Sequence, residues 1–383
     1  METCCGKKII KSIIKVFSIA LLFSNISIAQ WTFGISTDQE YNSNPFRSPL
    51  ATKSFISTVD FGLENDLNSF SIGYYGSYIN FNELSDRNFY WHQFAIWKDL
   101  ENGTFGLYAE QRLNRELYNY FDYTNYTAYY LQKFNVSDFY FSVNPHLSLS
   151  KYENISILDN LKGSLALNLN HGFETETTLI LGGTFTYKKY LDPTQSGQIT
   201  YLNESNQLVT EKYTDKNVSS ITQILSYLRV AQSLGDKTGI AAQFTNRSII
   251  NGFANQVKEL NMIYGDESEI FDDPVNFEGN SIALELTKIL GEDWTFKLGY
   301  YINNKFYPSQ GIYNALSEYN TNIMRTDVQN IFDINLKKSF PLNEAETTSL
   351  SLRLNYQYIN NKSNSYWFQY NGNSFNVGLS LEF

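Results

Sequence analysis

The sequence predicts an all-β transmembrane barrel: about sixteen antiparallel strands (fourteen to eighteen possible) running up and down, with short periplasmic turns and long extracellular loops. Three observations predict it. Apolar residues recur at every second position, tight and long connections alternate along the chain, and aromatic residues are abundant. Successive side chains of a strand point to opposite faces, so such strands build a wall with one apolar and one polar side.

Residues 1–29 have the parts of a secretory signal peptide, and we expect cleavage to leave one barrel domain over residues 30–383. Four lysines precede a short apolar run at 16–23, and the small residues Ser27 and Ala29 end the segment. The run is shorter than the roughly 20 residues of a membrane-spanning helix. Both cysteines, Cys4 and Cys5, lie in this segment, so the mature chain is expected to form no disulfide.

The net charge argues against nucleic acid as a partner. Residues 1–29 hold four lysines and one glutamate, a net charge of +3, so their removal changes the net charge of the chain from −10 to −13. Affinity for a phosphate backbone comes largely from Lys and Arg, which an acidic chain lacks in excess.

Alternating apolar and polar residues, bounded by polar or Gly, Asn and Asp clusters, predict the strands in order. Residues 350–357 are a clear example, because Leu350, Leu352, Leu354 and Tyr356 alternate with polar side chains. The strands are expected at residues 31–37, 53–64, 69–81, 87–98, 103–114, 122–134, 138–150, 159–170, 174–188, 217–233, 238–250, 278–289, 293–306, 325–338, 347–360 and 374–383.

The connections favour a barrel over a soluble sheet. Those after even-numbered strands are tight and rich in Gly, Asn and Asp, which supply the positive φ of short turns. Those after odd-numbered strands are long, notably 38–52, 189–216, 251–277, 307–324 and 361–373. A chain threaded from the periplasm produces this alternation, and an even strand number leaves both termini in the periplasm.

The polar positions are expected to line a lumen. Charges of both signs there require a wet interior, since an unpaired charge in a dry one costs several kcal/mol. A ring of this size is too wide for its own side chains to fill. Alternatively, arginines and acids brace the wall as ion pairs that close the bore. The lumen candidates are Glu110, Arg112, Glu174, Glu176, Arg247, Glu285, Lys297, Asp327, Asp333 and Arg353.

Three tryptophans are predicted to lie in the membrane interface. Trp31, Trp97 and Trp294 fall at the periplasmic ends of their strands. An indole ring is apolar with one polar N–H, so it suits the boundary between lipid tails and headgroups.

The sequence predicts no enzyme and no cofactor or metal site. It has no Gly-x-Ser-x-Gly or phosphate-binding glycine loop. His92 and His146 have lumen parity in the predicted strands and are candidate general bases, but hydrogen-bonded lumen residues are the preferred interpretation. Carboxylates at 265–273 could bind Ca²⁺, yet their spacing matches no defined calcium loop, which favours a solvated acidic loop.

The closing strand Phe375–Phe383, the phased turns and the signal peptide together resemble porin-type outer-membrane β-barrels of Gram-negative bacteria, over residues 30–383. The resemblance implies secretory export, insertion into the bacterial outer membrane and recognition of Phe383 by the barrel-assembly machinery; it leaves the oligomeric state open. The expected function is a porin-like passive channel for small hydrophilic solutes. The alternative is a non-conducting structural, adhesin or secretion-partner barrel that acts through its extracellular loops.

Overall fold

A computed structural model describes nine segments of the chain, two of them by their backbone alone, 195–202 and 208–215. The expected signal peptide lies outside them. In this part of the chain no helix has the length and apolarity that crossing a membrane requires. The described segments are 31–67, 69–192, 195–202, 208–215, 219–254, 273–291, 294–316, 318–343 and 348–383.

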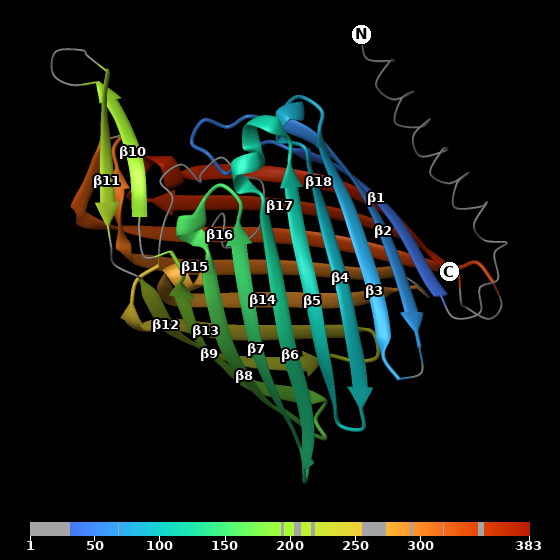
Figure 1. Cartoon of the computed structure of the whole chain (residues 1–383). Coiled ribbons are helices and arrows are strands. Elements are labelled where there is room, and N and C mark those ends of the chain that lie inside the picture. Colours follow the sequence, from blue (N-terminus) through green and yellow to red (C-terminus); the bar gives the residue numbers. More distant parts are fainter. Residues whose placement is uncertain are drawn as a thin grey trace.

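Sixteen strands form one closed antiparallel barrel in chain order, as predicted. In Figure 1 the blue to green strands cross the orange and red ones, as the tilt of barrel strands requires. The barrel strands are β1 (Trp31–Asn42), β2 (Ser54–Asp66), β3 (Ser71–Phe81), β4 (Phe89–Leu100), β5 (Gly103–Asn114), β6 (Tyr123–Val136), β7 (Phe139–Tyr152), β8 (Asn160–Gly172), β9 (Thr177–Tyr190), β12 (Ser220–Ser233), β13 (Thr238–Gly252), β14 (Glu278–Leu290), β15 (Trp294–Tyr313), β16 (Tyr319–Pro341), β17 (Ser349–Ser363) and β18 (Tyr370–Glu382).

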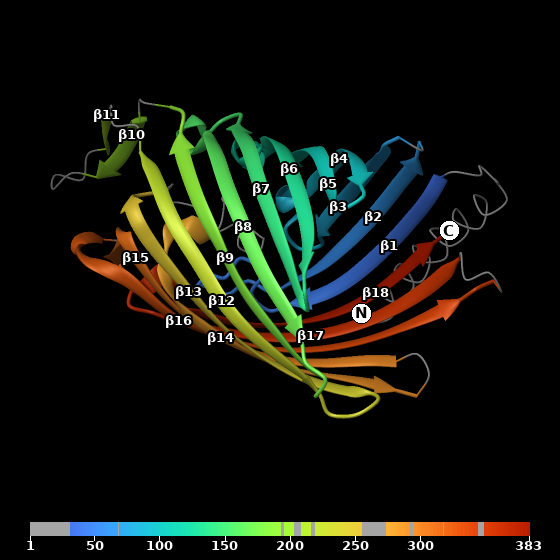
Figure 2. The same cartoon turned by 90° about the horizontal axis from the view of Figure 1, so that it is seen from below.

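The first and last strands close the barrel. β1 pairs with β18 from Gly34 opposite Glu382 to Asn42 opposite Ser374, and the two strands lie together in Figure 2. Beyond that register, Phe33 and Phe383 exchange both backbone hydrogen bonds, at 2.8 and 3.0 Å. Their rings stack with centroids 5.7 Å apart. The terminal aromatic residue therefore completes the wall at its seam.

The turns and loops fall at opposite ends of the barrel. Short turns join even-numbered strands to the odd-numbered strands that follow them, and Gly235 and Gly291 adopt positive φ of 128° and 64° in two of these turns. Longer connections at the other end contain short 3-10 helices: η1 (Ser85–Arg87), η2 (Glu116–Phe121), η3 (Ser156–Leu158), η5 (Pro274–Asn276) and η6 (Tyr366–Phe368). We call this end external, following the threading predicted from the sequence.

Three successive external loops share one hydrogen-bonding device. In each, the residue after a 3-10 helix returns its side chain to the end of the preceding strand and accepts a backbone N–H there. The device satisfies a donor that the strand pairing leaves over. The three bonds run from Phe81 N–H to Asn88 Oδ1 (2.7 Å), from Asn114 N–H to Asp122 Oδ1 (2.6 Å) and from Tyr152 N–H to Asp159 Oδ1 (2.7 Å).

Buried apolar side chains gather under the external loops rather than in a central core. One of them, which we call the rim cluster, holds Phe46, Ile56, Ile79, Phe81 and Phe89. A second is built on Phe121, Tyr152 and Leu158, and a third on Tyr190, Ile221, Ala254 and Val275. Among the described residues, the external rim is thus packed like the inside of a globular protein.

Several predicted loops are partly strand. β15 continues to Tyr313 and β16 begins at Tyr319, whereas the sequence indicated a loop over 307–324 because Pro308 and Gly311 interrupt the pattern. The register shifts between Tyr307 and Gly311, so a bulge absorbs both residues. β1 also extends past Thr37, to Asn42. The sequence did not predict this part of the strand, because the outward-facing Gln39 is polar and interrupts the apolar alternation. The Gln39 side chain accepts a hydrogen bond from Ser57 of β2.

The predicted loop 189–216 contains a hairpin that the sequence analysis missed. β10 (Gln195–Leu202) and β11 (Leu208–Asp215) pair with each other and with no barrel strand. In Figures 1 and 2 this hairpin stands beyond the external strand ends, away from the wall.

The loop device predicts a measurable loss of stability in Asp159→Ala. The substitution leaves the buried Tyr152 N–H without its acceptor, so the free energy of unfolding should fall by about 1–3 kcal/mol. Urea unfolding in detergent micelles measures it. Asp192→Ala is the control: its carboxylate accepts from Ser156 at an exposed position, and a change within about 0.5 kcal/mol is expected. Equal losses in the two variants would contradict the device.

Candidate functional site

The strand register assigns one face of the wall to the lumen. On β17, Arg353, Asn355 and Gln357 line an internal cavity. Their neighbours Leu352, Leu354 and Tyr356 lie on the opposite face, because side chains alternate along a strand. Large apolar residues on that outward face are exposed around the barrel, for example Phe61, Phe94, Leu107, Leu147, Phe185, Phe244, Leu284 and Phe375.

The larger cavity has a volume of about 710 Å³ and lies between β1–β6 and β17–β18. Its lining includes three acids and three arginines: Glu40, Asp60 and Glu110, with Arg47, Arg112 and Arg353. External loop 1, which joins β1 to β2, also lines it through Asn44, Pro45 and Arg47. The loop therefore folds inward and narrows the bore.

Loop 1 is held inward by packing and hydrogen bonds. Asn44 is buried, and its Nδ2 donates to the carbonyl of Ser48 (2.8 Å) and to that of Asn371 (3.0 Å). Asn371 lies near the start of β18, just outside the part of the strand that pairs with β1. Phe46 belongs to the rim cluster, and the Arg87 guanidinium lies 4.5 Å from its ring centroid. The same guanidinium lies 3.9 Å from the Tyr118 ring of loop 3. Loops 1, 2 and 3 are thereby joined through one arginine.

A second cavity of about 390 Å³ adjoins the first, and Glu110 and Tyr123 line both. Here the inward-folded element is the end of the loop joining β13 to β14, with Asp273, Pro274 and Val275 in the wall. The part of that loop at 255–272, including acidic residues 265–272, lies outside the described residues. Glu110 therefore marks the boundary between two polar cavities bounded by loops from opposite sides of the barrel.

Polar side chains from two strands hold the end of this loop. Lys188 of β9 is 2% exposed and makes an ion pair with Asp273, with 2.7 Å between Nζ and Oδ2. Gln223 of β12 donates to the carbonyls of Pro274 (3.0 Å) and Phe277 (2.8 Å). A buried lysine requires such a partner, so the pair fixes residues 273–277 inside the mouth.

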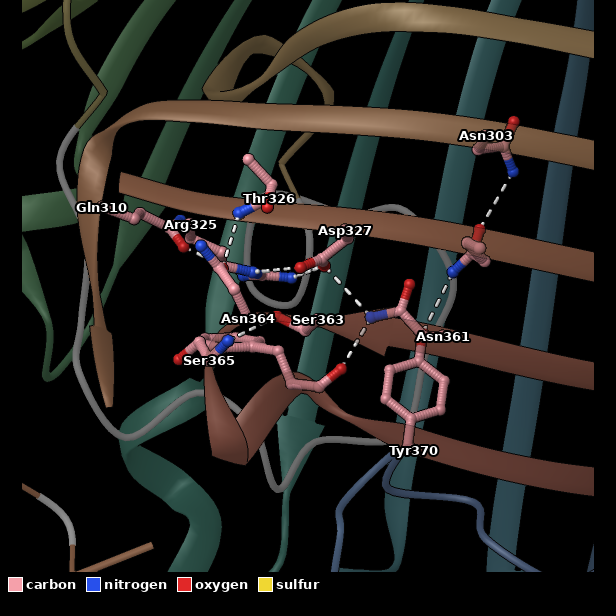
Figure 3. A network of polar contacts seen from close by, with 12 residues as sticks. Asn303, Gln310, Arg325, Thr326, Asp327, Asn361, Ser363, Asn364, Ser365 and Tyr370 are labelled. Atoms are coloured by element: carbon pink, nitrogen blue, oxygen red, sulfur yellow. Dashed lines mark hydrogen bonds and ion pairs between the residues drawn. The ribbon is translucent and has the colours of Figure 1, made fainter. Parts of the chain in front are cut away.

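A third inward anchor is a network at the external ends of β15–β17 (Figure 3). The Arg325 guanidinium donates through two nitrogens to the Asp327 carboxylate and through a third to Gln310 Oε1 (2.9 Å). It lies between the rings of Tyr307 and Phe368, at 3.9 and 3.3 Å from their centroids.

Asn361 extends the network to the last external loop. Its Nδ2 donates to Asp327 Oδ2 at 3.1 Å and to the Phe368 carbonyl at 2.6 Å, as Figure 3 shows for the carboxylate. Gln329 of β16 donates to the Tyr370 hydroxyl (3.0 Å) and accepts from Asn303 (3.0 Å). The external mouth is thus cross-linked from β15 to β18.

The structure places eight of the ten lumen candidates on the lumen face. Glu110 accepts from Gln93 (3.0 Å) and from the Tyr123 hydroxyl (2.5 Å). The Arg112 guanidinium donates to Asn114 (3.1 Å) and stacks 3.9 Å from the Phe89 centroid. Arg247, Glu285, Lys297, Asp327, Asp333 and Arg353 share this face by register.

Two of these candidates, Arg353 and Glu285, each form an ion pair with a residue two strands away. Arg353 of β17 donates to Asp38 of β1 at 2.6 Å. A Cβ on Gly378 of β18 would lie 2.4 Å from that carboxylate, so only glycine leaves room for the pair. Arg229 of β12 likewise pairs with Glu285 of β14 at 2.6 Å. Both pairs run along the wall rather than across the bore.

Glu174 and Glu176 were predicted wrongly as lumen residues. β9 begins at Thr177, and both glutamates are exposed in the turn that precedes it. Glu176 has a φ of 59°, a conformation of turns rather than strands. The predicted strand began three residues too early because alternating Thr and Glu continue the pattern into the turn.

Two further placements differ from expectation. Trp97 lies at the predicted strand end but on the lumen face. Its ring covers Gly73 so closely that a Cβ added to this glycine would lie 3.1 Å from the ring. Trp31 and Trp294 lie on the outward face, and Lys338 Nζ is 5.3 Å from the Trp294 centroid. His92 also faces outward: its neighbour Trp91 lines the cavity, and its Nδ1 contacts the Tyr74 hydroxyl at 2.8 Å.

Several lining residues were missed from the sequence. Asp38 fell in a predicted loop. Asp60, which accepts from Ser36 (2.7 Å) and Ser77 (2.5 Å), was visible in the alternation of 55–63 and was not singled out. Arg229 was hidden because Leu225 faces the lumen and breaks the alternation of its strand. In each case the available signal was a charged residue at a position whose neighbours two residues away also face the lumen.

Comparison with known proteins shows a fold shared with the two solved structures below whose TM-scores exceed 0.5. No protein-family model matches the chain, and no curated protein sequence does. Similar solved structures include OccAB3 and OccAB1 of Acinetobacter baumannii, with TM-scores of 0.52 and 0.51, and the outer membrane protein opdK of Pseudomonas aeruginosa, with 0.46. They cover 93%, 92% and 92% of this chain and 100%, 96% and 98% of their own, at 8%, 9% and 9% identity.

A closed hydrogen-bonded wall with an apolar outside and a polar inside is the architecture that spans bacterial outer membranes. The protein is an outer-membrane β-barrel. Its outward residues contact the membrane lipid. The expected role of Phe383 as an assembly signal stays a prediction, whereas its position in the seam of the outer-membrane barrel is a structural fact.

The facing of the tryptophans predicts opposite quenching in variants that each retain a single tryptophan. With Trp97 retained, aqueous iodide should quench the fluorescence; with Trp294 retained, brominated phospholipid should quench it. Both variants are measured in the same liposomes. Lipid quenching of Trp97 equal to that of Trp294 would contradict the inward placement.

The mouth network predicts a large loss of stability in Asp327→Ala. The change leaves the buried Arg325 guanidinium without its carboxylate, so the free energy of unfolding should fall by about 3–5 kcal/mol. Asp333→Ala, on the same strand and face, removes a carboxylate whose partner Asn355 is only partly buried. A smaller loss is expected there; the reverse order in denaturant titrations would refute the assignment.

Proposed function

We propose that this outer-membrane β-barrel is a passive channel for small hydrophilic solutes. The observation that carries the proposal is the pair of adjoining polar cavities, about 710 and 390 Å³, that share Glu110 and Tyr123 inside the barrel. A ring of sixteen strands is too wide to be filled by its own side chains, so space for water and solute is expected along the axis.

The ion pairs support a lined wall rather than a closed bore. Asp38 with Arg353 and Arg229 with Glu285 each reach across a single strand, and Arg325 with Asp327 lies within one strand. Pairs of this kind brace the wall without bridging opposite sides. Narrowing comes instead from the inward ends of two external loops, at Pro45 and at Pro274.

The cavities are less acidic than the chain. Their acids are Glu40, Asp60, Glu110 and Asp273, and their bases are Arg47, Arg112, Lys162, Arg247 and Arg353. A nearly balanced lining gives little electrostatic preference for anions or cations. The proposed channel therefore sorts solutes by size and hydrogen bonding more than by charge.

A non-conducting barrel that acts through its external loops is the second candidate. The observation that favours it is the β10–β11 hairpin, which pairs with no barrel strand and stands outside the wall. Loops held by a rigid scaffold often carry binding function.

We further infer that the protein is not an enzyme. His92 faces outward toward Tyr74, and neither His92 nor His146 lines the two cavities. A general base must lie within hydrogen-bond reach of a bound substrate. We therefore expect the His92→Ala and His146→Ala variants to keep the bilayer conductance and the ligand binding of the wild type in the experiments below.

The channel proposal predicts discrete conductance steps in planar bilayers. In Glu110→Gln, loss of one negative charge at the boundary of the cavities should shift the reversal potential toward anion preference, while Gln keeps an acceptor for Tyr123. Glu382→Gln, near the periplasmic end of the same face, is the control and should shift it less. A folded protein without any step would overturn the channel and favour the loop-binding alternative.

A further inference from the structure

We propose that the larger cavity is a binding site for a neutral saccharide, a solute class more specific than the channel proposal on which it rests. Its volume, about 710 Å³, lies within the roughly 300–1,000 Å³ typical of small-molecule sites. Three features of its lining point to this class: exposed aromatic rings, dense neutral hydrogen-bonding groups, and charges that already have partners.

Two partly exposed aromatic side chains line the cavity. Tyr75 of β3 and Trp91 of β4 line it and remain 41% and 36% exposed. Trp91 pairs in register with Ser77, so Tyr75 is its diagonal neighbour, with Cβ atoms about 7 Å apart. The nearby Phe89 is not available, because the Arg112 guanidinium covers its ring.

Exposed rings in a water-filled lumen are unfavourable unless something covers them. The C–H groups on the face of a pyranose carry slight positive charge and pack on the negative face of an aromatic ring. The Tyr75 hydroxyl lies near the Asp60 carboxylate, which accepts hydrogen bonds from Ser36 (2.7 Å) and Ser77 (2.5 Å). Tyr75 and Trp91 thus form an aromatic platform on two neighbouring strands.

Neutral polar groups surround the platform. An uncharged polyhydroxylated ligand needs many donors and acceptors and no net charge, which amides and hydroxyls supply. On β17, four strands from β3 along the wall, Asn355 donates to Asp333 (2.9 Å) and Gln357 lies two residues on. Other neutral polar lining residues include Asn42, Asn44, Thr58, Ser77, Tyr123, Asn373 and Ser374.

The charged groups of the cavity argue against an ionic or zwitterionic ligand. Arg353 is paired with Asp38, Glu110 accepts from Gln93 and Tyr123, and Arg112 donates to Asn114. A charged ligand would have to compete with these contacts for the same groups. Carboxylate oxygens with spare lone pairs can still accept from sugar hydroxyls, so the same groups suit a saccharide.

The test uses the full-length protein and two neutral trisaccharides, maltotriose and cellotriose. We expect at least one to bind in calorimetric titrations of the detergent-solubilised protein and to block the bilayer current reversibly. In Trp91→Ala the half-saturating concentration should rise at least about tenfold, equivalent to 1.4 kcal/mol. Trp294→Ala, which removes an outward-facing indole, should match the wild type.

The outcomes separate the two proposals. Saccharide binding without conductance keeps this site and removes the channel. Conductance without binding or block by either trisaccharide overturns the site and keeps the channel. Equal binding of the zwitterion triglycine, or unchanged saccharide affinity in a folded Trp91→Ala variant, also overturns it.

Discussion

The structure depends on one constraint: within lipid, every backbone N–H and C=O must find a partner in the protein itself. An open sheet leaves two unpaired edges, so the wall has to close, and here β1 and β18 close it with Phe33 and Phe383 at the seam. Once the wall is closed, alternation along each strand separates two solvents. Lipid then selects apolar side chains on one face, and water permits charged ones on the other.

The external half of the lumen is stabilised by different contacts from those of the wall. There the barrel holds its own loops inward with buried charges and apolar clusters, through Lys188 with Asp273, Arg325 with Asp327, and Phe46 in the rim cluster. Such contacts resemble the core of a soluble protein placed at the mouth of a pore. They leave polar space below and between the loops, which supports passage or binding of a small solute rather than a sealed interior.

Most of the wall was predictable because most strands repeat a period-two signal, and the predicted sixteen strands with phased connections agree with the structure. Errors arose where that signal fails locally. Thr and Glu extended the pattern into the turn at Glu174 and Glu176, and the bulge beyond Tyr307 concealed a continued strand. The site was less predictable, because the approach of loop residues such as Asn44 or Asp273 to the lumen depends on contacts between distant strands that no local pattern encodes.

Labelling of successive residues along one strand tests most directly whether lipid lies on one side of the wall and water on the other. The cysteines of the chain, Cys4 and Cys5, lie in the expected signal peptide, so single cysteines can be placed one by one along β17 of the protein in liposomes. A charged, membrane-impermeant maleimide should label positions 353, 355 and 357 and spare 352, 354 and 356. Uniform labelling of all six, or the reverse alternation, would contradict a lipid-facing and a lumen-facing side.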